Sequence, residues 1–549
     1  MTYASPRTSP PGQPAMGEPG NLHVLEPSTA EEFGAALEAL IESCLAFKFS
    51  SPHVIAPRGI DRDRLRAAAE VSASGADLES VVAWFATEVL PACLNFSAPT
   101  FVAHPDAGNS TAGILGGIAD AFLQQNLSSF DYSPVATLLE TELLRSIRRV
   151  VGYDAEEFGS ASAAGGGAVF GGAGANFSCL LAAREHLKRR LAAEGKVFDP
   201  RRTRVLANRP FTHFSMRRSL FMLGLGNRDL TAAQRREQGL DEECLFEVAS
   251  NRFRTDPDDL ERQIEAVRAR GEEIMCIFAV AGDSRFMAFD DITRLAEIAE
   301  RHNLWLHVDA CEGGQVLFSP RRRHLMAGIE RAHSVSLDPH KVLLVPYNLS
   351  LFFLREPSWL SYFSGDPTSL ISQDETSLGG YTPGINSKSF ISLKLLLMLR
   401  HWGWDRLAVE IDRRHDLARR AADWINSEPS LRLINPEVSH NAVGFMYVPE
   451  TADEGADPNR VDGLNSLNRA IHERLNTSTP FFVHAFSTRD DEAQVHDEKG
   501  SVFALRMMFG NPLTTWSVVR ECLETVVKVG FELAASFPSP APARDGDQA

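Results

Sequence analysis

Residues 335–341 read Val-Ser-Leu-Asp-Pro-His-Lys (VSLDPHK), an apolar run that ends in a lysine and is followed by a second apolar run, VLLVPYN. An amine beside so much hydrocarbon loses hydration, which lowers its pKa and makes it a nucleophile able to form a Schiff base. The same pattern is also typical of a strand end whose lysine reaches back to water. Only the residues that accompany Lys341 elsewhere in the chain distinguish the two interpretations.

On both sides of this stretch, from Gly165 to about Arg355, short buried strands alternate with helical patterns. Strands separated by helices predict a mostly parallel sheet with helices on both faces, hence an α/β fold. In such sheets, ligands bind beyond the carboxyl ends of the strands. The expected strands are RVLANR (204–209), IMCIFAV (274–280), LWLHVDA (304–310), SVSLD (334–338) and LSLFFL (349–354).

The chain of 549 residues is too long for a single hydrophobic core, so several domains are expected. Helical patterns predict an N-terminal helical segment over 26–110, and a large domain over 111–390 contains the sheet and a long helix over 134–150. Two further helical patterns and two strand patterns predict a small α+β domain over 391–538. The ends, 1–25 and 539–549, are rich in proline, glycine or other small residues and are expected to be disordered tails.

Composition excludes several classes of function. A formal net charge of −17 argues against nucleic-acid binding, which needs a basic face. Seven scattered cysteines without a CxxC pair predict reduced thiols rather than a disulfide framework or a metal site, which fits a cytoplasmic protein. Neither a signal peptide nor an apolar run long enough to span a bilayer is visible, so no membrane partner is expected.

Two strand ends carry groups that bind an anion or a cation. The segment FGGAGANFSCLLAARE (170–185) places glycines directly before a helical pattern, and the bare amides of a helix start can cradle a phosphate. It matches neither a Walker loop nor a GxGxxG fingerprint, and a flexible connection would read the same way. Asp309 ends LWLHVDA, where a buried carboxylate needs a cation such as a protonated pyridine nitrogen, unless it only caps a turn.

His213 follows the end of RVLANR and can stack on a flat ring, although a histidine in apolar surroundings is more often a packing residue. A phosphate cradle, a stacking histidine, a strand-end aspartate and a strand-end lysine, in this order, together predict a binding site for pyridoxal 5'-phosphate. The combination is much more specific than any one of its members.

With these residues in place, the chain resembles the pyridoxal-phosphate-dependent group II amino-acid decarboxylases, the family of glutamate, aromatic amino-acid, histidine and diaminobutyrate decarboxylases. The resemblance extends from about Phe96 to Asn511 and is clearest in QNLSSFDYSPVATLLETELL, GGAGANFSCLLAARE, THFSMRRSLFMLGLG, HVDACEGG and SVSLDPHK. It implies an aspartate aminotransferase-like fold (fold type I) with a mostly parallel seven-stranded sheet. It also implies a carboxy-lyase that acts as a homodimer with shared active sites.

The resemblance carries specific roles over to this chain. Lys341 would bond covalently to the cofactor, Asp309 would pair with its pyridine nitrogen, and His213 would stack on its ring and help to protonate the product. Further cofactor contacts would come from His340, Ala173, Gly174, Cys311 and Ser215, and the substrate pocket from His104, Pro105, Asp106 and Ala107. A tyrosine on a mobile loop usually supplies the proton, and Tyr362 and Tyr381 are both candidates, although each is as readily a packing residue.

Departures from the family pattern bear on the substrate. Val280, Asp283 and Ser284 replace threonines, His333 replaces a common aspartate, and Ala107 replaces a hydroxyl residue of some relatives. Because 96–129 contains neither arginine nor lysine, the sequence favours a neutral substrate, aliphatic like valine or leucine, or aromatic. Decarboxylation of glutamate or diaminobutyrate, with Asp106 receiving a cationic side chain, remains an alternative. So do decarboxylative oxidative deamination to an aldehyde and a degenerate homologue that serves only as a binding or scaffold protein.

Overall fold

The computed structural model describes residues 24–49, 54, 61–71, 75–106, 108, 110–154, 164–208, 212–363, 377–383, 387–450, 460–495 and 500–535. The chain divides into two compact units, one formed by 1–51 with 55–94 and the other by 52–54 with 95–549. Residues 1–23 and 536–549, which include most of the expected tails, lie outside the described residues, as does Ala107.

The first unit is helical. Its helices are α1 (Ala30–Phe49), α2 (Arg62–Ala68) and α3 (Leu78–Trp84), and α3 continues through the short turns η1 (Phe85–Val89) and η2 (Leu90–Ala92). Asp61 and Asp77 cap α2 and α3 by accepting backbone N–H groups of the first turn, which these helix starts otherwise leave unpaired. α1 contacts α3, yet none of its residues is buried.

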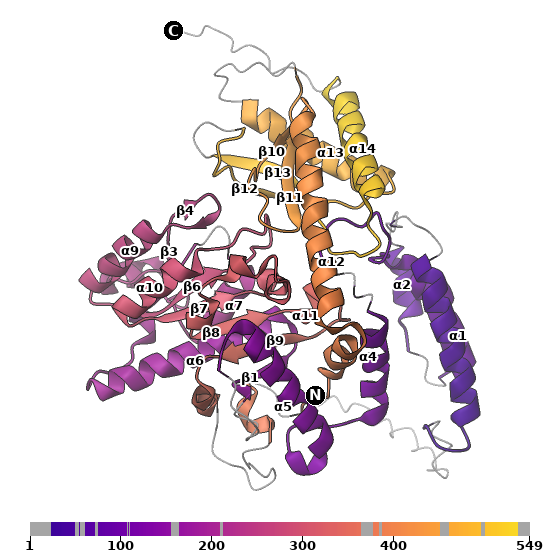
Figure 1. Cartoon of the computed structure of the whole chain (residues 1–549), viewed down its shortest axis with the longest axis horizontal. Coiled ribbons are helices and arrows are strands. Elements are labelled where there is room, and N and C mark those ends of the chain that lie inside the picture. Colours follow the sequence, from indigo (N-terminus) through magenta and orange to yellow (C-terminus); the bar gives the residue numbers. More distant parts are fainter. Residues whose placement is uncertain are drawn as a thin grey trace, which may run out of the picture. The chain divides into compact units, whose positions relative to one another are not determined.

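The second unit contains a seven-stranded sheet in the order β1-β9-β8-β7-β6-β2-β3 (Figure 1). The pairs among β2, β3, β6, β7 and β8 are parallel, and β9 is antiparallel to both of its neighbours, β1 and β8. This confirms the expected mostly parallel seven-stranded sheet. The strands are β1 (Gly166–Val169), β2 (Thr203–Ala207), β3 (Leu245–Glu247), β6 (Glu273–Val280), β7 (Trp305–Asp309), β8 (Ser334–Leu337) and β9 (Ser350–Leu354).

Helices cover both faces of this sheet, and each face has its own hydrophobic core. The helices α5 (Pro134–Val151), α9 (Pro257–Ala269) and α10 (Ile292–His302) pack on one face, with residues such as Leu306 and Val308 of β7. The helices α6 (Gly171–Ala193) and α7 (Phe214–Met222) pack on the other, where Trp305 points. Burial on both faces explains why these strands read as continuous apolar runs.

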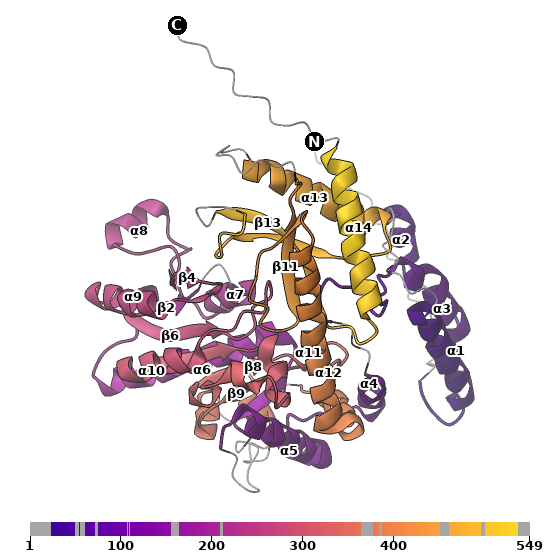
Figure 2. The ribbon, with the colours of Figure 1, turned by 45° about the horizontal axis from the view of Figure 1, so that its top comes forward.

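The C-terminal part forms the expected small α+β domain around a four-stranded antiparallel sheet (Figure 2). Its strands, in the order β10-β11-β13-β12, are β10 (Leu431–Leu433), β11 (Ala442–Tyr447), β12 (His484–Arg489) and β13 (Ser501–Met508). The remaining elements of the unit are α4 (Thr111–Leu123), α8 (Ala232–Gln238), β4 (Ser250–Asn251), β5 (Arg254–Thr255), α11 (Pro339–Val342), α12 (Leu393–Ser427), α13 (Arg460–Ser478) and α14 (Trp516–Ala534).

α12 joins the two sheets. The sequence pattern predicts two helices here, and the structure runs them together across a kink at Gly403, whose φ of 65° is a left-handed conformation that glycine adopts without strain. Past the kink, α12 contacts β10 and β11 of the small sheet. None of the helices within the described ranges combines the length and apolar character needed to cross a bilayer.

A buried ion pair ties α5 to the start of α12. Lys388 Nζ lies 3.0 Å from Glu140 Oε1, and both side chains are almost fully buried. Lys388 also donates to the Ala168 carbonyl oxygen of β1, and Ser392 Oγ donates to Glu140 Oε2 at 2.6 Å. The pair therefore links α5, β1 and the residues that directly precede α12.

Replacing Lys388 by methionine should lower the free energy of unfolding by about 3–5 kcal/mol, because Glu140 would be left buried without its cation. Chemical denaturation followed by circular dichroism measures the change. The double variant Glu140→Leu, Lys388→Met is the control, and it should lose clearly less stability than Lys388→Met alone. Equal losses would contradict the assignment of the cost to the unpaired charge.

Candidate cofactor site

The carboxyl ends of the strands meet around one cavity of about 230 Å³. Val280 and Asp309, the last residues of β6 and β7, are paired in register at its floor. The first turn of α6 follows β1, and Lys341 follows β8. The lining residues are Gly171, Gly172, Ala173, Asn176, His213, Ser215, Val280, Gly282, Asp283, Ser284, Asp309, Cys311, Glu312, Asp338, His340 and Lys341. Seven of the eight predicted cofactor residues therefore line one cavity, and Gly174 does not.

Lys341 lies in the short helix α11 and carries its amine into the cavity. Its Nζ atom lies 3.2 Å from Asp338 Oδ2 and 3.3 Å from Glu312 Oε1. Burial alone would lower the pKa of Lys341, but the charges of Glu312 and Asp338 raise it well above its ordinary value. The expectation of a lowered lysine pKa is therefore wrong for this structure, because the apolar neighbours in the sequence are not the neighbours in space.

Asp309 is buried at the end of β7 and is held by two donors. Its Oδ2 accepts from Asn176 Nδ2 at 2.8 Å, and its Oδ1 accepts from the Cys311 amide at 3.1 Å and lies 3.3 Å from Ser336 Oγ. Burial alone would raise the pKa of Asp309, but the neighbouring His307 ring and these hydrogen bonds hold it below its usual value. The group is thus an ionised carboxylate, which is what a protonated pyridine nitrogen requires.

Asn176 of α6 connects Asp309 to a buried polar chain. Its Oδ1 accepts from Ser336 Oγ at 2.7 Å and lies 3.1 Å from His307 Nε2, and His307 Nδ1 lies 2.9 Å from Ser334 Oγ. Burial lowers the pKa of His307 to about 4, so the ring is neutral near pH 7. This chain fixes the direction in which the Asp309 carboxylate points.

Replacing Asn176 by alanine should reduce the turnover of the cofactor-loaded protein by about 10- to 100-fold, the range for partners that orient a bound group. The fold should survive, because the change removes one polar side chain and leaves the apolar side chains of the sheet core in place. Steady-state kinetics together with the cofactor dissociation constant measure the effect. Turnover and cofactor affinity equal to those of the unchanged chain would show that Asp309 needs no such partner.

His213 is the N-cap residue of α7, and its Nδ1 accepts from the Ser215 amide at 3.2 Å and lies 2.8 Å from Ser215 Oγ. Burial, followed by the charge of Lys341, lowers the pKa of His213. Ser215 therefore holds the ring of a neutral histidine, as a residue that stacks on a flat ring needs. Both residues line the cavity, in agreement with their predicted places.

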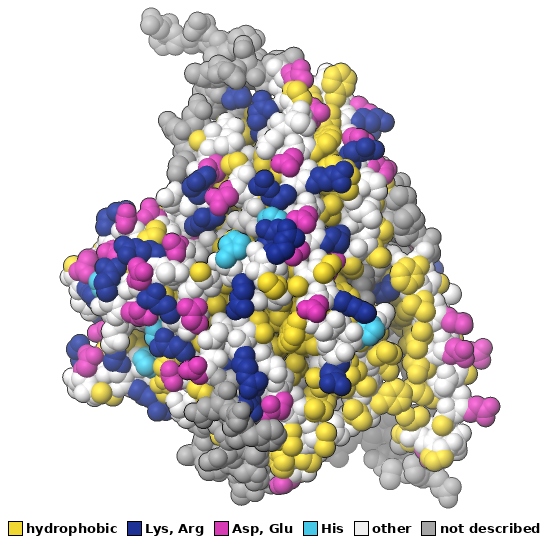
Figure 3. Space-filling view, in the orientation of Figure 1, with side chains coloured by type: hydrophobic (Ala, Val, Ile, Leu, Met, Phe, Trp, Pro, Cys, Tyr) yellow, Lys and Arg dark blue, Asp and Glu magenta, His cyan; other side chains and the backbone are white. Residues whose placement is uncertain are grey.

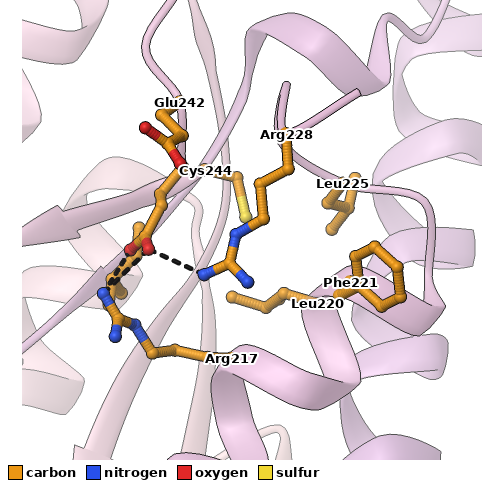
Figure 4. Close-up of a pocket in the computed structure, with 9 residues that line it drawn as sticks. Arg217, Leu220, Phe221, Leu225, Arg228, Glu242 and Cys244 are labelled. Carbon is orange, nitrogen blue, oxygen red and sulfur yellow. Dashed lines mark hydrogen bonds and ion pairs between the residues drawn. The ribbon is translucent and has the colours of Figure 1, made fainter. Parts of the chain in front are cut away.

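A second pocket lies beside α7 (Figure 4) and explains how this helix is held. Glu243 accepts from Arg217 at 2.6 Å and from Arg228 at 2.7 Å, so one carboxylate joins α7 to the following loop. The pocket has about 20 Å³, room for about one water molecule. We therefore assign it a structural role, which is to anchor the helix that carries His213.

The first turn of α6 lies where the sequence predicts a phosphate cradle. Gly171 has a φ of 75°, and a Cβ atom on Gly172 would come within 2.6 Å of Asp338 Oδ2 and 2.9 Å of Cys311 Sγ. A side chain at 172 would thus fill the space in front of the helix start. His340 also faces the cavity, where its Nδ1 lies 2.6 Å from the Leu349 carbonyl oxygen and its Nε2 lies 3.9 Å from Asp338 Oδ2.

The residues present fit pyridoxal phosphate. A glycine cradle at a helix start suits the phosphate, Asp309 suits the ring nitrogen, His213 and Cys311 lie on the cavity wall, and Lys341 supplies the amine. One buried carboxylate oxygen in the cavity, Glu312 Oε2, has no hydrogen-bond partner. Unpaired buried polar atoms of this kind are costly, which is expected of a cavity shaped for a polar ligand.

The predicted substrate segment lies near the cavity but is not part of its wall. His104 Nδ1 lies 2.7 Å from Asp106 Oδ2, and Pro105 packs against Gly510. Burial alone would raise the pKa of Asp106, but the hydrogen bond and charge of His104 and the charge of Lys341 lower it. Ala107 lies outside the described residues, so its predicted place is not described.

Arg506 of β13 brings a cation to this side of the cavity. It donates to the carbonyl oxygens of Ala103 and Ser284, and its buried Nε has no hydrogen-bond partner. Burial lowers the pKa of Arg506, and the charges of Glu312, Asp283 and Asp106 oppose that shift. The preference for a neutral substrate rests on the absence of arginine and lysine from 96–129, whereas Arg506 comes from a strand about 400 residues away in sequence.

The two tyrosines predicted as proton donors are not brought to the cavity. Tyr362, in η9 (Pro357–Phe363), lies on the outer side of α6, with its hydroxyl 3.1 Å from His186 Nδ1 and its ring under Arg189. Tyr381, in η10 (Gly379–Tyr381), packs at the edge of two hydrophobic clusters. Most of the loop between them, 364–376, lies outside the described residues, so the role of either tyrosine stays a prediction.

The departures from the family pattern have structural explanations. Asp283 accepts three backbone amides, from Arg285, Phe286 and Ala288, so its carboxylate holds a turn. His333 accepts from the Leu306 amide and packs on Trp305, away from the cavity lining. Val280 lines the cavity in place of a threonine.

The sequence interpretation missed four residues that lie at or near the cavity: Asn176, Glu312, Tyr347 and Arg506. Tyr347 shares a hydrogen bond with Asp106, and its ring centroid lies 4.8 Å from that of His340. Asn176 lies in GGAGANFSCLLAARE and Glu312 lies in HVDACEGG, two segments that carry the family resemblance. Their polar side chains could therefore have been recognised as candidate site residues. No local pattern marks Arg506, because β13 belongs to the small sheet and lies far along the chain from the cavity residues.

Comparisons with known proteins identify the family of the chain. The family model "Pyridoxal-dependent decarboxylase conserved domain" matches residues 63–448, which is more than half of the chain. Cysteine sulfinic acid decarboxylase from Rattus norvegicus is 26% identical over 447 residues, covering 79% of this chain and 83% of that protein.

Solved structures share the fold. Mouse CSAD has a TM-score of 0.77 at 24% identity, covering 91% of this chain and 99% of that one. TDC from Oryza sativa, solved with PLP and tryptamine, has a TM-score of 0.79 at 22% identity, covering 93% and 100%. The 4-hydroxyphenylacetaldehyde synthase of Rhodiola rosea has a TM-score of 0.74 at 19% identity, covering 94% and 100%.

Proposed function

This chain belongs to the pyridoxal-dependent decarboxylase family, and we propose that it converts an L-amino acid into the primary amine and CO2. The observation that carries the proposal is the single cavity in which Lys341, Asp309 and His213 meet the glycine turn of α6. A degenerate homologue that serves only as a scaffold does not need an ionised Asp309 and a lysine amine in the same buried cavity.

When bound, pyridoxal phosphate supplies an electron sink for the electron pair that the departing CO2 leaves behind. Asp309 would keep the pyridine nitrogen protonated, because its carboxylate is ionised and fixed by Asn176. His213 would lie against the ring, and Lys341 would supply the amine that bonds to the cofactor. Arg506, with a buried Nε that has no partner, can hold the α-carboxylate of the incoming amino acid.

The substrate side chain stays a proposal. Every amino acid carries the α-carboxylate that we assign to Arg506, so this arginine does not by itself call for an acidic side chain. We therefore keep the neutral substrate, aliphatic like valine or leucine or else aromatic, as the proposal. Glutamate and diaminobutyrate are its competitors.

The test is to incubate the cofactor-loaded protein with single amino acids and to measure CO2 and amine. The panel should contain valine, leucine, phenylalanine, tryptophan, glutamate, cysteine sulfinate and diaminobutyrate. Release of equal amounts of CO2 and amine from a neutral member supports the proposal, and exclusive use of an acidic or a diamino member overturns the substrate class. Absence of CO2 with every amino acid in a protein that binds the cofactor would overturn the activity.

Decarboxylative oxidative deamination is the second candidate, because Val280 replaces a threonine on the cavity wall and one structural neighbour is an aldehyde synthase. The same reaction mixtures distinguish the two activities. An aldehyde with ammonia and consumption of oxygen would indicate oxidation, whereas an amine without oxygen consumption indicates simple decarboxylation.

We also propose a homodimer in the cytoplasm. Apolar side chains gather over α4 and α5 (Figure 3), and many of them are strongly exposed, which favours a further protein surface there. The exposed members include Leu115, Phe122 and Leu123 of α4 and Val135, Leu138 and Leu139 of α5. Sedimentation equilibrium should give twice the chain mass, and replacing Val135 by aspartate should shift the equilibrium toward the monomer.

A further inference from the structure

One carboxylate oxygen of Glu312 lies beside the amine of Lys341, and the other accepts no hydrogen bond. Its Oε1 lies 3.3 Å from Lys341 Nζ, while its buried Oε2 has no hydrogen-bond partner. Glu312 and Lys341 line the same cavity, and the Glu312 side chain is only 12% exposed. The carboxylate therefore reaches from the amine of Lys341 toward the space in which a ligand amine would arrive.

The other acidic residues of the cavity wall are occupied in a different way. Asp309 is held by Asn176 and by the Cys311 amide, and Asp283 holds a turn through three backbone amides. Asp338 accepts from Ser350 Oγ through Oδ1, and its Oδ2 lies 3.2 Å from Lys341 Nζ, so both of its oxygens are occupied. Among the described residues of this wall, Glu312 is the carboxylate with one oxygen at the lysine and the other free for a second amine.

We propose that Glu312 is a catalytic residue that carries a proton from the incoming amine to Lys341, an inference that rests on the proposed function. An amino acid arrives as an ammonium ion, and its nitrogen becomes a nucleophile only after losing a proton. Glu312 accepts this proton through Oε2. The freed nitrogen can then attack the cofactor carbon to which Lys341 is bonded.

The step balances without any other reactant. One bond forms between the substrate nitrogen and the cofactor carbon, and the bond from this carbon to Lys341 Nζ breaks, with its electron pair returning to Nζ. Glu312 then gives its proton to the departing amine, so the carboxylate is regenerated and nothing is oxidised or reduced. The product state is an ammonium at Lys341 beside an ionised Glu312, which is the ion pair present in the structure.

Amine exchange can be measured without decarboxylation. The cofactor-loaded protein is mixed rapidly with propylamine, a primary amine without a carboxylate, and the visible absorbance change gives the exchange rate. Glu312→Gln should slow the exchange about a hundredfold at neutral pH, within the range for loss of a positioned base. The deficit should shrink as the pH rises, since propylamine then arrives already deprotonated. Glu300→Gln, which changes a surface carboxylate paired with Arg331, should exchange like the unchanged protein.

A second variant distinguishes loss of proton transfer from a structural effect of the substitution. Glu312→Ala should be slow in the same way, and added formate should restore part of its rate, because a small carboxylate can occupy the vacated place. A Glu312→Gln rate within about threefold of the unchanged protein, an equal deficit at every pH, or no rescue by formate would overturn the proposal. Failure of the unchanged protein to bind the cofactor through Lys341 would instead overturn the proposed function.

Discussion

Lys341→Ala should abolish the covalent attachment of pyridoxal phosphate and reduce decarboxylation about 10⁴-fold or more, the scale on which loss of an enzyme's covalent nucleophile acts. The physical reason is that Lys341 brings its amine into the cavity from α11, and no other lysine lines this cavity among the described residues. Borohydride reduction followed by mass spectrometry measures the attachment, and CO2 release measures the activity.

Lys188→Ala is the matched control, because Lys188 is an exposed lysine on α6 that pairs with Glu185 at the surface. It should keep both the cofactor adduct and the activity. A cofactor adduct that persists in Lys341→Ala, on another lysine and with activity intact, would show that the wrong amine has been assigned. Thermal unfolding of the variant without cofactor excludes a folding defect as the cause.

Asp309→Asn should lower turnover about a thousandfold, at the upper end of the cost of removing one preorganised electrostatic group. Asparagine keeps the shape and can still accept from Asn176, but it has no charge to keep a pyridine nitrogen protonated. We therefore expect a large loss in kcat, and a weaker cofactor affinity through loss of the ion pair. Kinetics on the best substrate and a cofactor titration by fluorescence measure the two effects.

The control is Asp291→Asn, the same change at the N-cap of α10, where Asp291 accepts from the Arg294 amide. Asparagine caps helices about as well as aspartate, so this variant should behave like the unchanged protein. An Asp309→Asn protein whose turnover stays within about tenfold of normal would contradict an ion pair between Asp309 and the pyridine nitrogen. Loss of a charge at this place should lower turnover by more than that.

The strands and the cofactor residues were largely predictable from the sequence. The predicted strands from 204–209 to 349–354 became β2, β6, β7, β8 and β9, since continuous apolar runs bounded by helices have few other solutions. β1 was not predicted, because its GGAV sequence reads as part of a glycine turn. Glycine fits there since Phe352 and Phe353 of β9 leave no room for side chains at Gly166 and Gly167.

The electrostatic state of the site was not predictable in the same way. The run VSLDPHKVLLVPYN is apolar around Lys341, yet the fold places Glu312 and Asp338 within 3.3 Å and 3.2 Å of its amine. A pKa depends on charges nearby in space, and Glu312 comes from the end of a different strand. For the same reason, Tyr362 reads as a lid residue but packs on His186 of α6.

The amino-acid sequence alone determined the α/β class, the mostly parallel sheet and the cofactor, because strand periodicity, helix starts and strand-end residues are local features of the chain. The tertiary structure decided which groups share the cavity, Glu312 beside Lys341 and Asn176 behind Asp309, and it brought Arg506 to Ala103 from a distant strand. Charges and hydrogen bonds act over a few ångströms in space, whereas these partners are separated by about 30 to 400 residues along the chain.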